Sequence, residues 1–125
     1  MKNFQKIALC VIARENCIKV GNHEWKARHE AKIGEILSTA PSGSGIDNGI
    51  TLDLSRSTEE RLVLCTSFHH MNEHGMYDGW TEHEVIVKGS LWSDIDVRVT
   101  GKDRNGIKDY LSDVFFCWLT SIYED

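Results

Sequence analysis

The chain has 125 residues, of which 41% are hydrophobic and 26% are charged, and its formal net charge is −5. This composition is typical of a folded globular protein and excludes a mainly disordered one. The acidic balance and the absence of any run of basic residues argue against nucleic acid as a partner, since that ligand requires a basic surface.

Two helices are predicted in the N-terminal third of the chain. Apolar residues recur at helical spacing over residues 3–20, where Asn3 is a candidate N-cap. Gly21 can end this helix, and Asn22 can cap a second one. Residues 38–49, STAPSGSGIDNG, contain the only proline and three glycines, which predicts a loop. No apolar segment has the length needed to cross a bilayer, so we expect no membrane partner.

Four strand patterns occupy the middle of the chain. Residues 50–54 and 95–99 alternate strictly between apolar and polar types, whereas residues 61–70 and 80–88 are longer and rich in β-branched and aromatic types. The connections between them are short, which favours an antiparallel meander.

A strongly amphipathic helix is predicted from Ile107 to Ile122, with Asn105 or Asp103 as its cap. The order of elements therefore predicts an α+β fold with a single domain over residues 1–125. It comprises two N-terminal helices, a four-stranded antiparallel meander sheet and a C-terminal helix, with the helices on one face of the sheet.

The turn between the two long strands sets their register. Gly75 and Met76 fit a two-residue type II′ turn, which favours glycine at its first central position. This register gathers the apolar residues of all four strands on one face. It pairs Leu64 with Val87, Phe68 with His83, His69 with Glu82, His70 with Thr81, and Met71 with Trp80.

The opposite face of the sheet is expected to be exposed and mostly polar. Val63, Cys65 and Ile86 near its centre, with Met71 and Trp80 towards one end, form an apolar stripe on it. Apolar side chains grouped on a polar surface are more often contacts than accidents. We therefore expect a binding surface made of Val63, Cys65, His69, Met71, Trp80, Glu82, Glu84, Ile86 and Arg98.

The segment SFHHMNEHGMYDGWTEHE holds four of the six histidines. The predicted register separates them, because His69 faces one side of the sheet while His70 and His83 face the other. A three-histidine metal centre is therefore disfavoured. His70 and His83 could still bind a metal with a third ligand from a helix, but we favour hydrogen bonds within the protein. We expect no cofactor.

A catalytic alternative rests on the other face of the sheet. His69 with Glu82 and Glu84 could act as a general acid–base set, since a carboxylate can orient an imidazole. We favour a cross-strand polar contact on a solvated surface. No nucleophile with an activating neighbour is evident, so a non-enzymatic protein is the preferred interpretation.

The cysteine pattern indicates a reducing compartment. None of the four cysteines forms a C-x-x-C pair, which disfavours a zinc ribbon or a thioredoxin-type motif. We expect reduced thiols in the cytoplasm. They are Cys10, Cys17, Cys65 and Cys117.

Three runs, LSTAPSGSGIDNGI, SFHHMNEHGMYDGWTEHEVIV and VTGKDRNGIKDYLSDVF, resemble a family of short uncharacterised proteins of phages, prophages and plasmids. The resemblance covers about residues 37–116. It implies a cytoplasmic accessory protein of a mobile element and supplies no catalytic residues.

These observations favour a small cytoplasmic binding protein. Its open sheet face would contact a protein partner, such as a host factor, or a second copy of the chain in a homodimer. The alternative is a small metal-assisted hydrolase that uses His70 and His83.

Overall fold

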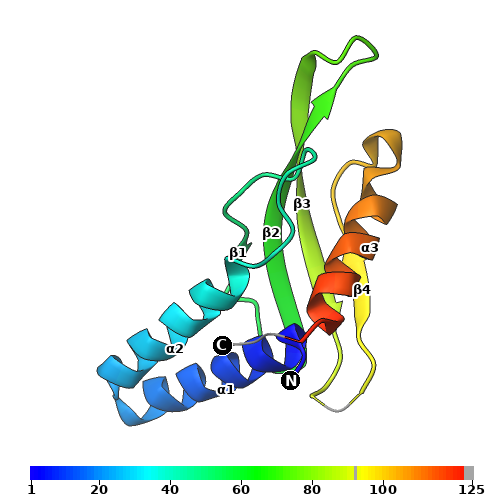
Figure 1. Ribbon diagram of the computed structural model, residues 1–125. Coiled ribbons are helices and arrows are strands. Elements are labelled where there is room, and N and C mark those ends of the chain that lie inside the picture. The colour runs from blue at the N-terminus through cyan, green and yellow to red at the C-terminus, as the bar shows by residue number, and fades with distance from the viewer. Residues whose placement is uncertain (92, 123–125) are drawn as a thin grey trace.

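The computed structural model of the protein describes residues 1–91 and 93–122. It confirms the predicted α+β fold: two helices precede a four-stranded antiparallel sheet and a third helix follows it (Figure 1). Residues 123–125 of the expected domain lie outside the described residues. The elements are α1 Asn3–Val20, α2 His23–Leu37, β1 Thr51–Leu52, β2 Arg61–Met71, β3 Tyr77–Lys88, β4 Asp96–Val99, η1 Arg104–Gly106 and α3 Ile107–Thr120.

The sheet is a meander with strand order β1-β2-β3-β4, and every neighbouring pair is antiparallel. β2 and β3 are much longer than the strands at the two edges. β1 ends early because Asp53 begins a turn, in which its carboxylate accepts hydrogen bonds from the Ser55 amide and hydroxyl. The predicted strand 50–54 is therefore reduced to two residues.

The start of α1 differs from the prediction. Lys2 is the N-cap, and its backbone N–H donates to Gln5 Oε1 at 2.9 Å, so the assignment of Asn3 as the cap is wrong. Asn3 is instead buried, and its Nδ2 donates to the carbonyl of Trp118 at 2.8 Å. This bond joins the first turn of α1 to the last turn of α3.

The junction between α1 and α2 follows the sequence signals, whereas the start of α3 does not. Gly21 ends α1 in the left-handed conformation, with φ at 72°, and Asn22 Oδ1 accepts the Trp25 N–H at 3.2 Å. At α3 the prediction is wrong: the N-cap is Gly106 rather than Asn105 or Asp103, although Asp103 Oδ1 accepts the Lys108 N–H at 3.1 Å. These contacts satisfy backbone groups that a helix end leaves free.

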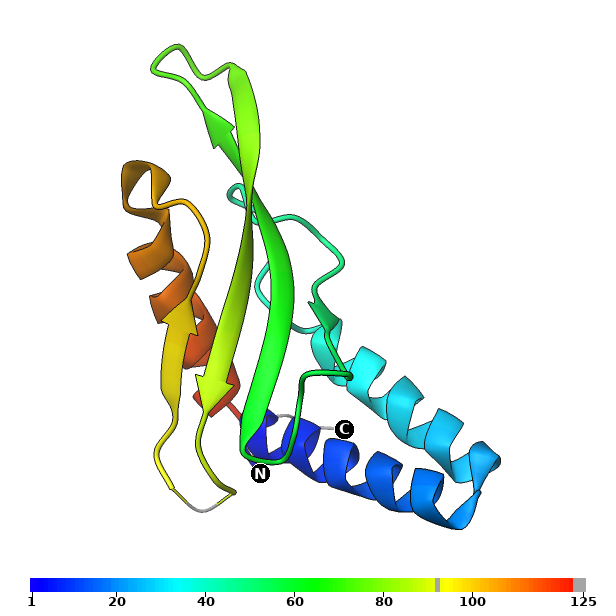
Figure 2. The same cartoon turned by 180° about the vertical axis from the view of Figure 1, so that it is seen from behind.

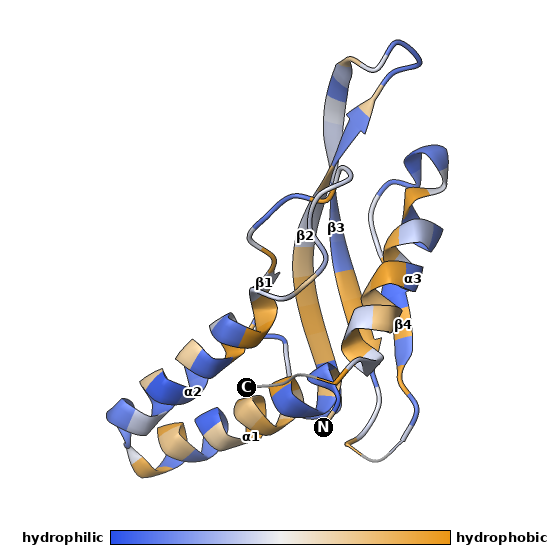
Figure 3. Cartoon of the chain, viewed as in Figure 1, coloured by the Kyte–Doolittle hydropathy of each residue, from blue (hydrophilic) through white to orange (hydrophobic). Residues whose placement is uncertain are grey.

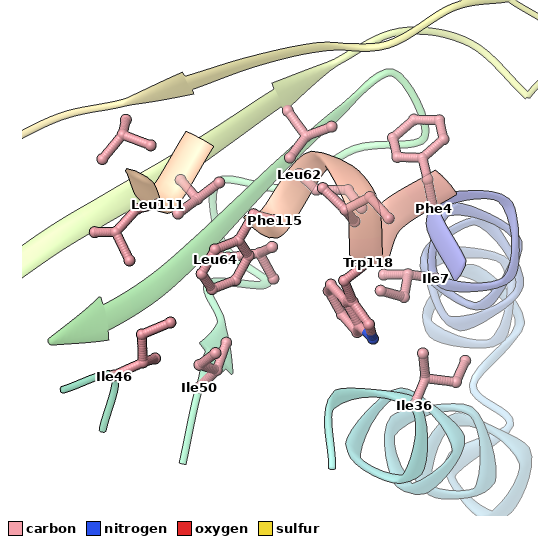
Figure 4. Close-up of a cluster of buried hydrophobic side chains, with 14 of the residues drawn as sticks. Phe4, Ile7, Ile36, Ile46, Ile50, Leu62, Leu64, Leu111, Phe115 and Trp118 are labelled. Carbon is pink, nitrogen blue, oxygen red and sulfur yellow. The ribbon is translucent and has the colours of Figure 1, made fainter. Parts of the chain in front are cut away.

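One hydrophobic core joins residues of all three helices to one face of the sheet (Figure 4). Phe115 of α3 lies beside Leu64 of β2, and Trp118 lies between α2 and the sheet, with its indole N–H donating to Thr39 Oγ1 at 3.0 Å. The buried core consists of Phe4, Ile7, Val11, Ile33, Ile36, Ile46, Ile50, Leu62, Leu64, Val85, Val87, Val99, Ile107, Leu111, Phe115, Trp118 and Leu119.

The pairing of β2 with β3 differs from the predicted register by two residues. Leu64 pairs with Val85 rather than with Val87, and Phe68 pairs with Thr81 rather than with His83. A shift of two preserves the face on which every side chain lies, because side chains alternate with a period of two. The core-facing set was therefore predicted correctly although its partners were not.

The turn itself explains the shift. Asn72 and Met76 pair through a backbone hydrogen bond of 2.8 Å, so the loop has three residues rather than two. Asn72 Oδ1 accepts the N–H groups of His74 and Met76, and Gly75 takes the left-handed conformation, with φ at 76°. This is the three-residue hairpin loop in which a left-handed residue follows a tight turn.

A bulge follows on β3. Met71 pairs with Tyr77 and His69 pairs with Trp80, so Asp78 and Gly79 together oppose His70. Gly79 has a φ of 87°, a conformation that glycine adopts without steric cost. Because of this extra residue, Tyr77 lies on the same face as His69, Met71 and Trp80.

Val63 was expected on the exposed face, and this is wrong, since its side chain is completely buried. It faces away from the helical core and lies under the connection between β1 and β2. Ser57 Oγ of that connection accepts the Val63 N–H at 3.0 Å, and Arg56 forms an ion pair with Glu84 on the open face. The connection therefore covers this part of the sheet face, which was predicted to be exposed to solvent.

The far ends of β2 and β3 form a two-stranded extension over residues 69–80, which we call the hairpin arm. It rises beyond the other strands, while α1 and α2 extend away from the opposite end of the sheet (Figures 1 and 2). Hydropathy changes along the ribbon: the parts of β2 and β3 beside the helices are hydrophobic, and the arm is mixed (Figure 3).

Candidate functional site

The four histidines of the hairpin lie in three environments. His70 and His83 are buried on the core face, His69 is on the open face, and His74 is in the turn. They do not converge, as the sequence predicted. Among residues 1–91 and 93–122, no group of three or more His, Cys, Asp or Glu side chains is placed to hold a metal ion.

The two buried histidines are joined by a threonine. His70 Nε2 lies 2.8 Å from Thr81 Oγ1, and Thr81 Oγ1 lies 2.6 Å from His83 Nε2. His83 Nδ1 lies 2.8 Å from the carbonyl oxygen of Thr100. The chain therefore uses three of the four ring nitrogens in hydrogen bonds within the protein, and we call it the His–Thr–His chain.

The direction of this chain follows from its last acceptor. A carbonyl can only accept, so His83 Nδ1 carries the hydrogen. In a neutral ring, His83 Nε2 then accepts from the Thr81 hydroxyl, and Thr81 Oγ1 accepts from His70 Nε2–H. Burial, together with the positive charge of Arg104, lowers the pKa of His70 below its ordinary value. Both effects favour a neutral His70.

The proposed acid–base set is not assembled. His69 pairs with Trp80 rather than with Glu82, and its Nε2 lies 3.5 Å from an Asp47 carboxylate oxygen. Glu82 pairs with Ser67, and Glu84 is held by Arg56. The two-residue change in register separates His69 from both glutamates, so this alternative has no geometric support.

The open face of the hairpin arm carries a group of large exposed side chains. Met71, Tyr77 and Trp80 are 65%, 60% and 59% exposed, and the rings of His69 and Tyr77 lie 5.9 Å apart. We call these four residues the hairpin patch. Tyr77 was not among the residues predicted for this surface, because the bulge in β3 was not expected. A glycine inside a strand, at Gly79, was the signal that could have indicated the bulge.

Contacts from outside the strands hold the arm in place. Arg104 donates to the carbonyl of Asp78 at 2.6 Å and to its carboxylate at 2.5 Å, which fixes the bulge. On the other edge, the His69 N–H donates to the carbonyl of Gly45 at 2.7 Å. Gly45 is required there, because a Cβ would collide with the ring of Phe68.

An acidic depression of about 470 Å³ adjoins the hairpin patch. Its floor includes Cys65 and Ser67 of β2, and its walls include Asp47, Glu82 and Glu84. Asp47 donates its backbone N–H to the carbonyl of Ser67 at 3.0 Å, so Asp47 and Glu82 flank Ser67 from opposite sides.

The remaining residues of the expected surface lie towards the other end of the sheet. Ile86 and Cys65 are half-buried, and Arg98 is exposed opposite Ile86. With Val63 covered, no continuous apolar stripe runs through the centre of the open face. The exposed apolar area is displaced to the hairpin arm.

Comparisons with models of known protein families, with curated proteins and with solved structures find no match for this chain. In the part of the chain that the structure describes, none of the helices combines the length and the apolar character required to span a bilayer.

Proposed function

We propose that this chain is a non-enzymatic binding protein that contacts a protein partner through the open face of its hairpin arm. The observation that carries the proposal is the hairpin patch, in which three of the four side chains are at least 59% exposed on one face of a projecting element. Aromatic residues and methionine are enriched at protein interfaces, and exposed groups of them mark contact sites.

The supports of the arm favour this use. Arg104 and Gly45 hold the two strands from opposite edges, so the patch is presented in a fixed arrangement before a partner arrives. A surface that is already ordered loses less conformational entropy on binding than a mobile loop does. Tryptophan and tyrosine on such a support are frequent centres of binding energy.

The resemblance to proteins of phages, prophages and plasmids suggests where the partner comes from. An accessory protein of a mobile element acts in the host cytoplasm, so the proposed partner is a host protein. The hydrolase alternative receives less support, because the His–Thr–His chain engages three of the four ring nitrogens with which His70 and His83 could bind a metal.

Affinity capture from the native host tests the proposal. The wild-type chain is compared with a Met71→Ala/Trp80→Ala double variant and with Trp25→Ala as the matched control, since Trp25 is also exposed, at 48%, but lies on α2. We expect a protein that is retained by the wild type and the control and lost by the double variant. Equal capture by all three chains would contradict the proposal. Sedimentation of the purified protein identifies a second copy as the partner if the wild type is dimeric and the double variant monomeric.

A further inference from the structure

The charges around the hairpin patch indicate which side chains a partner presents to it. Glu82 lies two residues from Trp80 on the same face of β3, a distance of about 7 Å along the strand. Its carboxylate has no ion-pair partner among the described residues, and the residue opposite is the small Ser67. Trp80 and Glu82 therefore offer an aromatic surface and an uncompensated negative charge side by side.

Two cations beside this surface are already engaged. Arg56 binds Asp53 and Glu84, and Arg104 binds Asp78. Neither is free to neutralise Glu82. Asp47, on the other side of Ser67, adds a second carboxylate to the same depression.

We infer that the hairpin patch and the adjoining acidic depression bind a basic segment of the partner protein, with a lysine or arginine side chain lying across Trp80 and its charged end directed at Glu82. This inference rests on the proposed function and specifies its chemistry. Long basic side chains pack their aliphatic stems on apolar surface while the charge stays in a polar environment. A cation near an aromatic ring gains further attraction from the ring.

Peptide titration followed by ¹⁵N NMR tests the inference. The probes are two blocked peptides of equal length, one alternating lysine with alanine and the other alternating glutamate with alanine. We expect the lysine peptide to shift the Trp80 indole and the backbone signals of Ser67 and Glu82. The shifts should diminish with added salt, which screens exposed charges. The glutamate peptide should leave these signals unchanged.

Variants locate the charge and the ring. Glu82→Gln should weaken binding of the lysine peptide roughly threefold, as expected for the loss of an exposed ion pair. Trp80→Ala should weaken it roughly tenfold, as expected for the loss of an interface anchor. Glu59→Gln, which makes the same change of charge at an exposed site before β2, should have no effect. The inference is overturned if the lysine peptide causes no shift at the patch, if both peptides cause equal shifts, or if Glu82→Gln and Glu59→Gln bind equally.

Two further outcomes separate the inference from the proposed function. If the lysine peptide causes no shift at the patch while host capture still depends on Met71 and Trp80, the arm binds a protein through a segment that is not basic. In that case the inference is wrong and the proposed function stands. If patch signals broaden with protein concentration alone, a second copy fills the patch and the inference is again wrong.

Discussion

The two faces of the hairpin arm and its base are built from the same stretch of sequence, but one face is buried and the other is open to solvent. On the core face, His70, Thr81 and His83 are buried and bonded to one another. On the open face, the alternating neighbour Trp80 is exposed and His69 is half-buried. A polar, histidine-rich segment can therefore supply a closed hydrogen-bond chain and an open contact surface at once, because strand side chains alternate between the faces.

The difference indicates where function is to be sought. Polar groups that are satisfied inside the protein contribute to the stability of the fold and offer little to a ligand. Exposed aromatic groups with no covering element contribute little to stability and are available to a partner. The following substitutions test this division, beginning with the largest expected effect.

Two tryptophans give the largest contrast. Trp118→Ala should lower the free energy of unfolding by about 3–5 kcal/mol, because the ring is only 8% exposed and packs in the core. Trp80→Ala should lower it by less than about 1 kcal/mol, as for exposed positions. Urea denaturation of both variants measures the difference. A small effect for Trp118→Ala would show that α3 faces a partner rather than the sheet.

Thr81→Val should have the next largest effect. Valine keeps the shape of threonine but removes the hydroxyl, so His70 Nε2 and His83 Nε2 both lose their hydrogen-bond partner. Leaving such buried groups unsatisfied costs about 1–3 kcal/mol. Ser67→Ala, on the open face, is the control and should change the free energy of unfolding by less than about 0.5 kcal/mol. Equal stability of the two variants would show that the His–Thr–His chain does not stabilise the fold.

The pH dependence of stability should follow His70. Its pKa is lower in the folded protein than the ordinary value of 6.5, which the unfolded chain retains. At pH values between the two, the unfolded state binds more protons, so stability should fall as the pH decreases below about 6.5. His70→Gln should reduce this dependence, and His69→Gln should preserve it. Urea denaturation between about pH 7 and pH 5 supplies the measurement; an unchanged profile in His70→Gln would contradict the assignment.

Arg104→Met should give the smallest change in stability, below about 1 kcal/mol, because the ion pair with Asp78 is partly exposed. Its local effect should be larger. Amide hydrogens of the arm should exchange faster, since the bulge loses the bonds that fix it. Removing the guanidinium should also raise the pKa of His70, measured by NMR titration of the ring. Unaltered hydrogen exchange in the arm would show that Arg104 is not needed to fix the bulge.

The sequence predicted the faces of the sheet better than its pairing. The apolar alternation that places Leu64 and Val85 on the core face is unaffected by a shift of two residues. The register depended on the turn, where the Asn72 side chain stabilises a three-residue loop that the Gly75-Met76 pattern did not reveal. The cover over Val63 could not be predicted, because it depends on contacts that the connection to β2 makes only after folding.

The same limits apply to the candidate site. Met71, Trp80 and Glu82 were correctly placed on the open face, whereas Tyr77 joined them only through the bulge at Gly79. The separation of the four histidines followed from strand alternation. The predicted register already placed Thr81 opposite His70, but the role of Thr81 as the link between His70 and His83 depends on side-chain positions that only the structure gives.

The most direct test of the account compares two variants altered at adjacent residues on opposite faces. The affinity of the partner recovered by host capture is measured for Trp80→Ala and for Thr81→Val, after circular dichroism has shown that both are folded. The account predicts that Trp80→Ala weakens binding roughly tenfold or more, as at an interface anchor, while Thr81→Val binds like the wild type. Loss of binding in Thr81→Val with normal binding in Trp80→Ala would contradict it and would place the function at the buried histidines.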